Sequence, residues 1–200
     1  AVQGHITSTA AIYLPIAKRA DVPLIIAHAR SAGVDKGIKG ILTRFLRRNL
    51  SKKADFLFTC SELAGISVFG KKAVEAGKTV FVPNAIDCGA FEYDGLRRQK
   101  IREELGLSDK YVIGHVGRFG HMKNHAFLLE VFVQIRERIP RSRLLLVGTG
   151  GLLEETRQRA AGLGVEQAVI FAGSQSAVAE YYMAMDFFVL PSILEGLPGS

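Results

Sequence analysis

Short apolar segments alternate along this chain with longer segments of helical periodicity, and this alternation limits the fold more than any other feature of the sequence. The apolar segments are nearly continuous, which is typical of strands that are buried on both faces of a parallel sheet. Seven strands are predicted: Val22–Ala27, Phe56–Cys60, Val80–Pro83, Tyr111–Val116, Leu144–Val147, Val169–Ala172 and Phe187–Leu190.

Helices are predicted between these strands. Apolar residues recur at helical spacing from Phe127 to Ile139, and Leu152–Ala161 and Ala177–Met185 are also predicted to be helical. Strands that alternate with helices indicate the doubly wound α/β class. In such sheets ligands bind beyond the carboxyl ends of the strands, so the residues that follow each strand are the first candidates for function.

A domain boundary is predicted near the middle of the chain. The segment between Asn84 and Gly95 is rich in turn-forming residues and has no periodicity. A basic segment of helical character, Leu96–Leu107, follows it. We therefore predict two Rossmann-like domains, residues 1–90 and residues 91–200.

The composition is that of a globular protein. The chain has 200 residues, of which 48% are hydrophobic and 22% charged, enough to build one large or two small cores. Its longest apolar runs are about half of the ~20 residues that a membrane-spanning helix needs. Cys60 and Cys88 have no metal-ligand spacing, so we expect free thiols, as in a reducing cytoplasm.

The formal net charge is +7, and much of the excess lies between Lys36 and Lys53, where seven Lys or Arg residues occur without an acidic one. Three interpretations are open: a solvated helix face, a surface that meets anionic lipid headgroups, and a nucleic-acid surface. The repeated aromatic residues typical of nucleic-acid binding are missing, so we expect no nucleic-acid partner. A lipid-binding surface would place the protein at the inner face of the cell membrane.

The segment Tyr111–Asn124 has the features of a phosphate-binding loop. A strand runs into a loop with Gly117 and Gly120, and a helix is predicted to begin near Asn124. Glycines allow close approach of a ligand, and the free N–H groups at a helix start favour an anion. Arg118 and Lys123 add two cations. The alternative is a plain turn with Asn124 as N-cap. His115 and His121, on either side, are expected to be a packing and a surface residue.

A second glycine-rich segment, Gly148–Gly151, follows the strand Leu144–Val147. The dinucleotide fingerprint G-x-G-x-x-G requires a third glycine, but Leu153 stands in its place. We therefore expect a tight turn near the ligand cleft and no nicotinamide binding. The sequence also contains no Asp-x-Asp motif, a pattern that can hold a divalent metal ion, so it gives no support for metal-dependent chemistry.

The segment Tyr111–Asn124 resembles the diphosphate-binding loop of retaining glycosyltransferases of family 4, which have the GT-B fold. Other matching stretches are FTCSE, VPNAIDCGAF, LLLVGTGG, VIFAG and FFVLPSILEGLPG. The similarity covers roughly residues 22–199 and is strongest to members of the exopolysaccharide-biosynthesis type. It implies two Rossmann-like domains of the GT-B type, both incomplete in this chain, with the acceptor site in the first and the nucleotide-sugar site in the second.

The resemblance also implies roles for individual residues. Glu195 would contact hydroxyls of the donor sugar, and the backbone amides of Gly196 and Leu197 would line its pocket. The family places a second Glu eight positions later, beyond Ser200. His28 stands where the family often has a histidine that faces donor and acceptor, and the alternative is a partly buried strand-end histidine. Weaker candidates on the acceptor side are Arg30, Ser61 and His5.

By this resemblance the protein is expected to be a hexosyl-type glycosyltransferase of polysaccharide biosynthesis. The donor would be a UDP-sugar rather than a GDP-sugar, and the acceptor a saccharide or lipid-linked saccharide. Transfer would proceed with retention and would need no metal and no cofactor. Two alternatives remain open, a nucleotide-sugar epimerase of the GT-B fold and a non-catalytic scaffold that keeps the fold.

Overall fold

The computed structural model describes residues 1–5, 7–32 and 37–199, and its contacts divide the chain into two compact units. The first unit comprises Ala1–Ile86 together with Leu194–Gly199, and the second comprises Asp87–Ile193. The division lies a few residues before the predicted boundary at 90/91. The predicted second domain also included 194–199, which group with the first unit because Leu197 packs against that unit's core.

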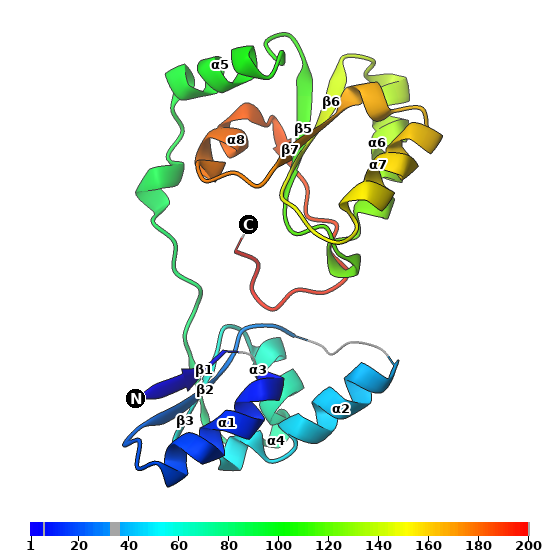
Figure 1. The fold of residues 1–200 in the computed structure, drawn as a ribbon. Coiled ribbons are helices and arrows are strands. Elements are labelled where there is room, and N and C mark those ends of the chain that lie inside the picture. The colour runs from blue at the N-terminus through cyan, green and yellow to red at the C-terminus, as the bar shows by residue number, and fades with distance from the viewer. Residues whose placement is uncertain (6, 33–36, 200) are drawn as a thin grey trace. The chain divides into compact units, whose positions relative to one another are not determined.

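The first unit contains a parallel four-stranded sheet with the strands in chain order, β1-β2-β3-β4 (Figure 1). The strands are β1 (Val2–Gly4), β2 (Ile25–Ala29), β3 (Phe56–Thr59) and β4 (Thr79–Phe81). The helices of this unit are α1 (Thr7–Arg19), α2 (Gly37–Arg47), the short η1 (Leu50–Lys52), α3 (Glu62–Phe69) and α4 (Lys71–Glu75).

Apolar side chains of α1, α3 and the strands build the core of the first unit. Ala10 and Leu14 of α1 pack with Ile25 of β2 and Leu57 of β3, all of them nearly or fully buried. The strand β2 begins at Ile25, three residues later than predicted, and Pro23 in the predicted range has no N–H to donate to a neighbouring strand.

The second unit contains a parallel four-stranded sheet of order β7-β6-β5-β8. Its strands are β5 (Tyr111–Val116), β6 (Ser142–Val147), β7 (Val169–Gly173) and β8 (Phe187–Phe188). The helices of this unit are α5 (Gly95–Glu104), α6 (His125–Arg138), α7 (Leu153–Gly162) and α8 (Val178–Ala184), with short helical turns η2 (Cys88–Phe91), η3 (His121–Lys123) and η4 (Glu166–Ala168).

Helices cover both faces of the second sheet. Ile113 of β5 contributes to a core with α6 and α7, whereas Val112 contributes to a separate core with α5 and α8. Figure 1 shows these two helix pairs on opposite sides of the strands. Successive strand residues point to opposite faces of the sheet. Because helices cover both faces, the side chains on both must be apolar, as the near-continuous apolar segments predict. The predicted doubly wound α/β class is confirmed.

Within the described residues, no helix has both the length and the apolar character needed to cross a membrane. Cys60 is buried and Cys88 exposed, and both are free thiols.

A charged cluster around Asp186 fixes the start of β8. The Asp186 carboxylate accepts hydrogen bonds from Arg98 (2.5 Å), from Arg102 (3.3 Å) and from the backbone N–H of Val112 (2.8 Å). Arg102 also donates to the carbonyl of Ala184 (2.8 Å). Burial opposes ionisation of Asp186, but the hydrogen bonds from Val112, Arg98 and Arg102 hold its pKa below the ordinary 3.8. The cluster therefore ties α5, β5 and β8 together.

Asp186→Asn is expected to lower the melting temperature of the second unit. The substitution removes a charge-assisted interaction with two guanidinium groups, each such hydrogen bond contributing about 1.5–3 kcal/mol. A loss of 1 kcal/mol lowers the melting temperature by about 2–4 °C in a chain of this size. Calorimetry at neutral pH measures the change.

The matched control is Asp109→Asn, because Asp109 is exposed and pairs with Lys110 at the surface. The Asp186 pKa is lower in the folded than in the unfolded state. Its stabilising contribution is therefore present above the unfolded value and is lost as the pH falls through the folded value. The difference between wild type and Asp186→Asn should shrink on acidification below pH 3.8. A difference that grows instead would contradict this assignment.

Candidate functional site

The predicted phosphate-binding loop lies at the carboxyl end of β5. After Val116 the chain continues through Gly117 and Arg118, and the turn η3 ends directly before α6 begins. A methyl group on Gly117 would lie 3.1 Å from Cε of Lys123, so the lysine side chain lies close over the glycine. Arg118 is exposed and Lys123 is half-buried. The loop thus places Lys123 next to the first turn of a helix, where anions are favoured, and carries the exposed Arg118 near its beginning.

Asn124 does not cap α6 in the way that the plain-turn alternative requires. Its backbone has φ 53° and ψ 45°, and its side chain makes no capping hydrogen bond. The left-handed conformation turns the chain sharply from η3 into the helix, and Asn tolerates it better than most residues. The first N–H groups of α6 therefore donate no hydrogen bond to the Asn124 side chain.

The loop after β6 supports the phosphate-binding loop through direct backbone contacts. Gly117 donates to the carbonyl of Val147 and Phe119 donates to that of Thr149, both at 2.9 Å. A methyl group on Gly148 would overlap the carbonyl oxygen of Gly117, and one on Gly150 would overlap that of Phe119. The glycines that suggested a dinucleotide motif allow two loops to pack backbone to backbone.

The order of the strands places this loop at a topological switch point. The chain moves outward from β5 to β6 and β7, and then returns to the other side of β5 to form β8. The segment after β8 meets the loop after β5, because Ile193 donates to the carbonyl of Met122 (2.9 Å). Ligands of open α/β sheets bind in the crevice at such a point.

A layer of aromatic rings lies beneath the loop. The ring of His125 stacks on that of Phe119, with centroids 4.1 Å apart, and meets His115 edge to face at 4.9 Å. His115 is fully buried and its Nδ1 donates to the carbonyl of Val189 (2.9 Å), while His121 is exposed, as predicted. Both nitrogens of His125 are buried and make no hydrogen bond with described residues. Burial, and then electrostatic interactions with His115 and Lys123, lower its pKa from 6.5 to about 4.

In the first unit, His28 is the fourth residue of β2 and is 6% exposed. Its Nδ1 forms a hydrogen bond with the side-chain amide of Gln3 (2.9 Å), and its ring lies 5.2 Å from that of His5. Burial is the main cause of its lowered pKa, to which the neighbouring His5 and Arg30 add. The imidazole is therefore neutral at pH 7 and held by a strand partner, Gln3, which no sequence pattern had indicated.

The segment that contains Glu195, Gly196 and Leu197 lies against the first unit, close to the end of β2. A methyl group on Gly196 would lie 2.8 Å from the carbonyl oxygen of Arg30, so this position requires a glycine. Asn84 donates to the carbonyl of Leu197 (2.8 Å) and accepts from Arg30 (2.8 Å). Asn84 was predicted only as part of a linker, and its contact with a residue 113 positions away is set by tertiary structure.

The predicted site residues thus form one group in each unit. The second unit brings Gly117, Arg118 and Lys123 together in a single loop, and the first unit brings Gly196 and Leu197 to the strand that carries His28. Ser61 caps α3 by accepting from Ala64 (3.2 Å), which is a structural role. No group of three or more His, Cys, Asp or Glu side chains within the described ranges could hold a metal ion.

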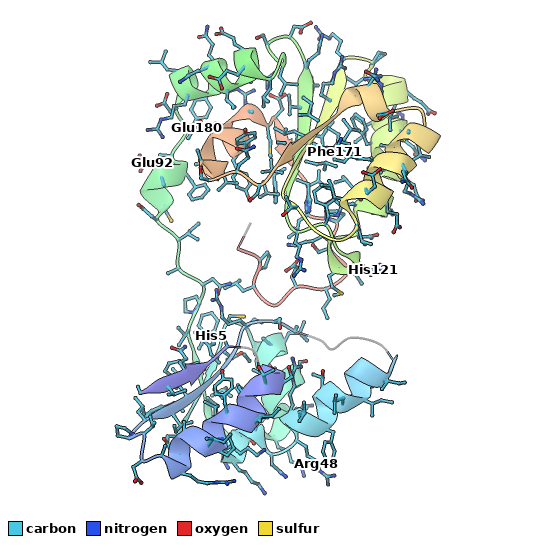
Figure 2. All side chains as sticks on the ribbon, in the orientation of Figure 1. His5, Arg48, Glu92, His121, Phe171 and Glu180 are labelled. Carbon is cyan, nitrogen blue, oxygen red and sulfur yellow. The ribbon has the colours of Figure 1, made fainter. Side chains whose placement is uncertain are left out.

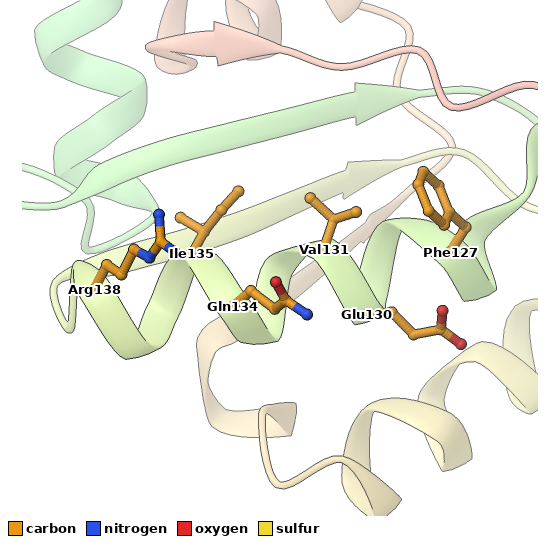
Figure 3. Close-up of a pocket in the computed structure, with 6 residues that line it drawn as sticks. All are labelled: Phe127, Glu130, Val131, Gln134, Ile135 and Arg138. Atoms are coloured by element: carbon orange, nitrogen blue, oxygen red, sulfur yellow. The ribbon is translucent and has the colours of Figure 1, made fainter.

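A groove along α6 contains none of the predicted residues. It is lined by Phe127, Glu130, Val131, Gln134, Ile135 and Arg138 (Figure 3). Glu130 is engaged with Arg159 of α7, and the remaining lining is largely apolar. Arg138 is the one cation of this lining, and it lies at the carboxyl end of α6, where the helix dipole does not favour an anion.

Solved structures with the same fold define the architecture. The chain superposes on a structure of Anabaena Alr3699/HepE in complex with UDP with a TM-score of 0.76, over 95% of this chain and 52% of that one, at 19% identity. At this identity the likeness concerns the fold. Two Rossmann-like units of this kind are the architecture of GT-B glycosyltransferases.

The family follows from the sequence comparison. Residues 97–200 match the family model described as glycosyl transferases group 1. The chain belongs to this family.

Two curated relatives extend the match beyond the second unit. The chain is 32% identical to the putative glycosyltransferase EpsF of Bacillus subtilis, over 99% of this chain and 53% of that protein. It is 29% identical to a GDP-mannose-dependent phosphatidylinositol monomannoside mannosyltransferase of Mycolicibacterium smegmatis, over 91% of this chain and 48% of that one. The chain spans about half the length of these relatives.

Gly150→Ala is expected to destabilise the second unit and to distort the loop above it. Gly150 has φ 155°, and a methyl group there meets the backbone of Phe119 rather than a movable side chain. Strain of this kind costs about 1–3 kcal/mol. Denaturant unfolding measures the loss. Gly151→Ala is the matched control, since no atom lies within 4 Å of the added methyl group, and equal losses in both variants would refute the steric argument.

Acidification from pH 6.5 towards pH 4 is expected to lower the free energy of unfolding through His125. Its pKa is about 4 in the folded state against an ordinary 6.5, so the unfolded chain binds the additional proton in this interval. The contribution of the neutral His125 side chain to stability is fully present above pH 6.5 and declines below it. His125→Leu should flatten the decline in melting temperature, and His121→Leu, at an exposed position, should not. Parallel pH profiles for the wild type and His125→Leu would exclude this assignment.

Proposed function

We propose that the protein transfers a hexosyl group from a UDP-sugar to a saccharide or lipid-linked saccharide with retention of configuration at the anomeric carbon. The observation that carries the proposal is the loop Gly117–Lys123 at the switch point of the second sheet. It combines a glycine backbone, two cations and the start of a helix, the elements that bind a diphosphate.

The choice of UDP is supported by a neighbour in fold rather than by a base-contacting side chain. The Anabaena protein Alr3699/HepE has been crystallised with UDP and with UDP-glucose. A GDP-mannose-dependent enzyme is also among the relatives. The proposal therefore predicts that UDP binds in preference to GDP, which a binding measurement can test. The exopolysaccharide-type resemblance and the match to EpsF support a saccharide acceptor.

In the proposed reaction the bond between the anomeric carbon and the diphosphate oxygen breaks, and a bond to the acceptor oxygen forms on the same face of the sugar. The departing phosphate takes the proton of the acceptor hydroxyl. Arg118 and Lys123 stabilise the negative charge that develops on the diphosphate, as preorganised cations do. The proposal assigns this stabilisation to side chains and helix N–H groups, without a metal ion or a cofactor.

The remaining predicted residues would orient the substrates. The carboxylate of Glu195 can accept from two sugar hydroxyls, while the backbone amides of Gly196 and Leu197 would line the sugar pocket. His28, with its lowered pKa, would align donor and acceptor as a neutral imidazole rather than as a cation. We propose a cytoplasmic location for this reaction.

Titration calorimetry with UDP, GDP, ADP and dTDP tests the proposal. UDP should bind, and Arg118→Ala should weaken binding by about ten-fold or more, because a charge-assisted contact with phosphate contributes about 1.5–3 kcal/mol. Arg138→Ala is the matched control, since Arg138 is exposed at the other end of α6. Binding of GDP in preference to UDP would show that the donor is a GDP-sugar and not a UDP-sugar. Equal effects of the two substitutions would exclude the loop as the diphosphate site.

A further inference from the structure

The helix α2 of the first unit exposes a continuous apolar stripe. Ile38, Ile41, Leu42 and Phe45 are 85%, 63%, 56% and 70% exposed. Their spacing of three and four residues places all four on one face of the helix. Isolated apolar residues are common at protein surfaces, but four of them on three turns of one helix form a patch that implies a partner.

The opposite side of α2 attaches the helix to its own unit. Gly40 is buried, Leu46 packs against the core, and Leu50, just beyond the helix, is fully buried. The helix also contacts α1, and Figure 1 shows it at the outer side of this unit. Because the inward positions are already occupied, the apolar stripe cannot be the side that faces the core.

Cations flank the apolar stripe. Arg44, Arg48 and Lys52 are exposed, and the sequence has no acidic residue from 37 to 53. At about 100° per residue, Arg44 and Arg48 lie beside Ile41 and Phe45 on the helix surface. Figure 2 labels Arg48 at the carboxyl end of this helix. Lys36, the first residue of the predicted basic segment, lies outside the described residues.

We propose that α2 is an interfacial helix that docks the first unit on a membrane rich in anionic lipid. Ile38, Ile41, Leu42 and Phe45 would enter the boundary between headgroups and acyl chains, while Arg44, Arg48 and Lys52 would contact lipid phosphates. A helix of eleven residues is about half the length needed to span a bilayer. Helices that lie in the interface plane combine an apolar face with basic residues that reach the headgroups, and α2 carries Arg44 and Arg48 beside its apolar stripe.

Charge complementarity favours a lipid surface over the other occupants of such a face. A fully solvated helix would carry polar residues where Ile38 and Phe45 lie. A second copy of the chain would bring Arg44 and Arg48 close to their counterparts, which is unfavourable. Nucleic acid would neutralise the cations but would not require three aliphatic side chains, since bases stack on aromatic rings. An anionic membrane satisfies the apolar and the basic residues together.

The docking surface does not depend on the proposed transfer reaction, so it is tested without nucleotide or acceptor. The chain contains no tryptophan, so Phe45→Trp introduces a single indole within the stripe. Its fluorescence should shift to the blue on addition of vesicles made of equal parts of phosphatidylglycerol and phosphatidylcholine. Vesicles of pure phosphatidylcholine should produce little shift. Phe127→Trp, on α6 beside Glu130, is the matched control and should not shift with either.

Co-sedimentation with the same vesicles gives the affinity. Arg44→Glu with Arg48→Glu should weaken binding about twenty-fold or more, since each cation near an anionic surface contributes about five-fold. Lys72→Glu with Lys78→Glu changes the net charge equally at exposed positions outside α2 and should weaken it much less. Phe45→Glu should weaken binding about ten-fold or more. All of these positions are exposed, and circular dichroism verifies folding.

Several outcomes would overturn the proposal. Absence of binding to anionic vesicles would do so, as would equal binding to pure phosphatidylcholine. Equal losses in the two charge-reversed pairs would show that net charge, and not this helix, drives association. A dimer that Phe45→Glu dissociates, without any vesicle binding, would assign the stripe to a second copy of the chain.

Discussion

The backbone contact between the loops after β5 and β6 is the interaction on which the second unit's candidate site depends. Gly117 and Phe119 donate to Val147 and Thr149, and the absence of side chains at Gly148 and Gly150 allows the two chains to approach. A loop held in this way has little freedom to rearrange. Its cations and the first turn of α6 are then presented together, as preorganised electrostatic stabilisation requires.

The support of this loop extends through the sheet. Phe119 is buried beneath it and stacks on His125, whose ring lies against His115 of β5. Asp186, held by Arg98 and Arg102, fixes the start of β8. After β8 the chain reaches Ile193, which donates a hydrogen bond to the carbonyl of Met122 in the loop after β5. The buried groups behind the loop therefore connect the stability of the second unit to the geometry of its candidate site.

Two separate parts of the first unit carry the residues with proposed roles. One part of it, near the carboxyl end of β2, holds His28 and receives the Gly196–Leu197 segment through Arg30 and Asn84. Another part, the helix α2, exposes apolar and basic side chains together. We propose that the first part orients the substrates and that the second meets a membrane.

The sequence by itself determined the class of the fold, because strands buried on both faces must be continuously apolar and helices must repeat at their own period. It also located the candidate phosphate-binding loop, since glycines and cations between a strand and a helix are local features. Tertiary structure decided the rest. The role of Gly150, the contact of Asn84 with Leu197, the bond from Gln3 to His28 and the exposure of Phe45 depend on residues distant in the chain. A helical pattern shows that one face is apolar, but only packing decides whether that face is covered.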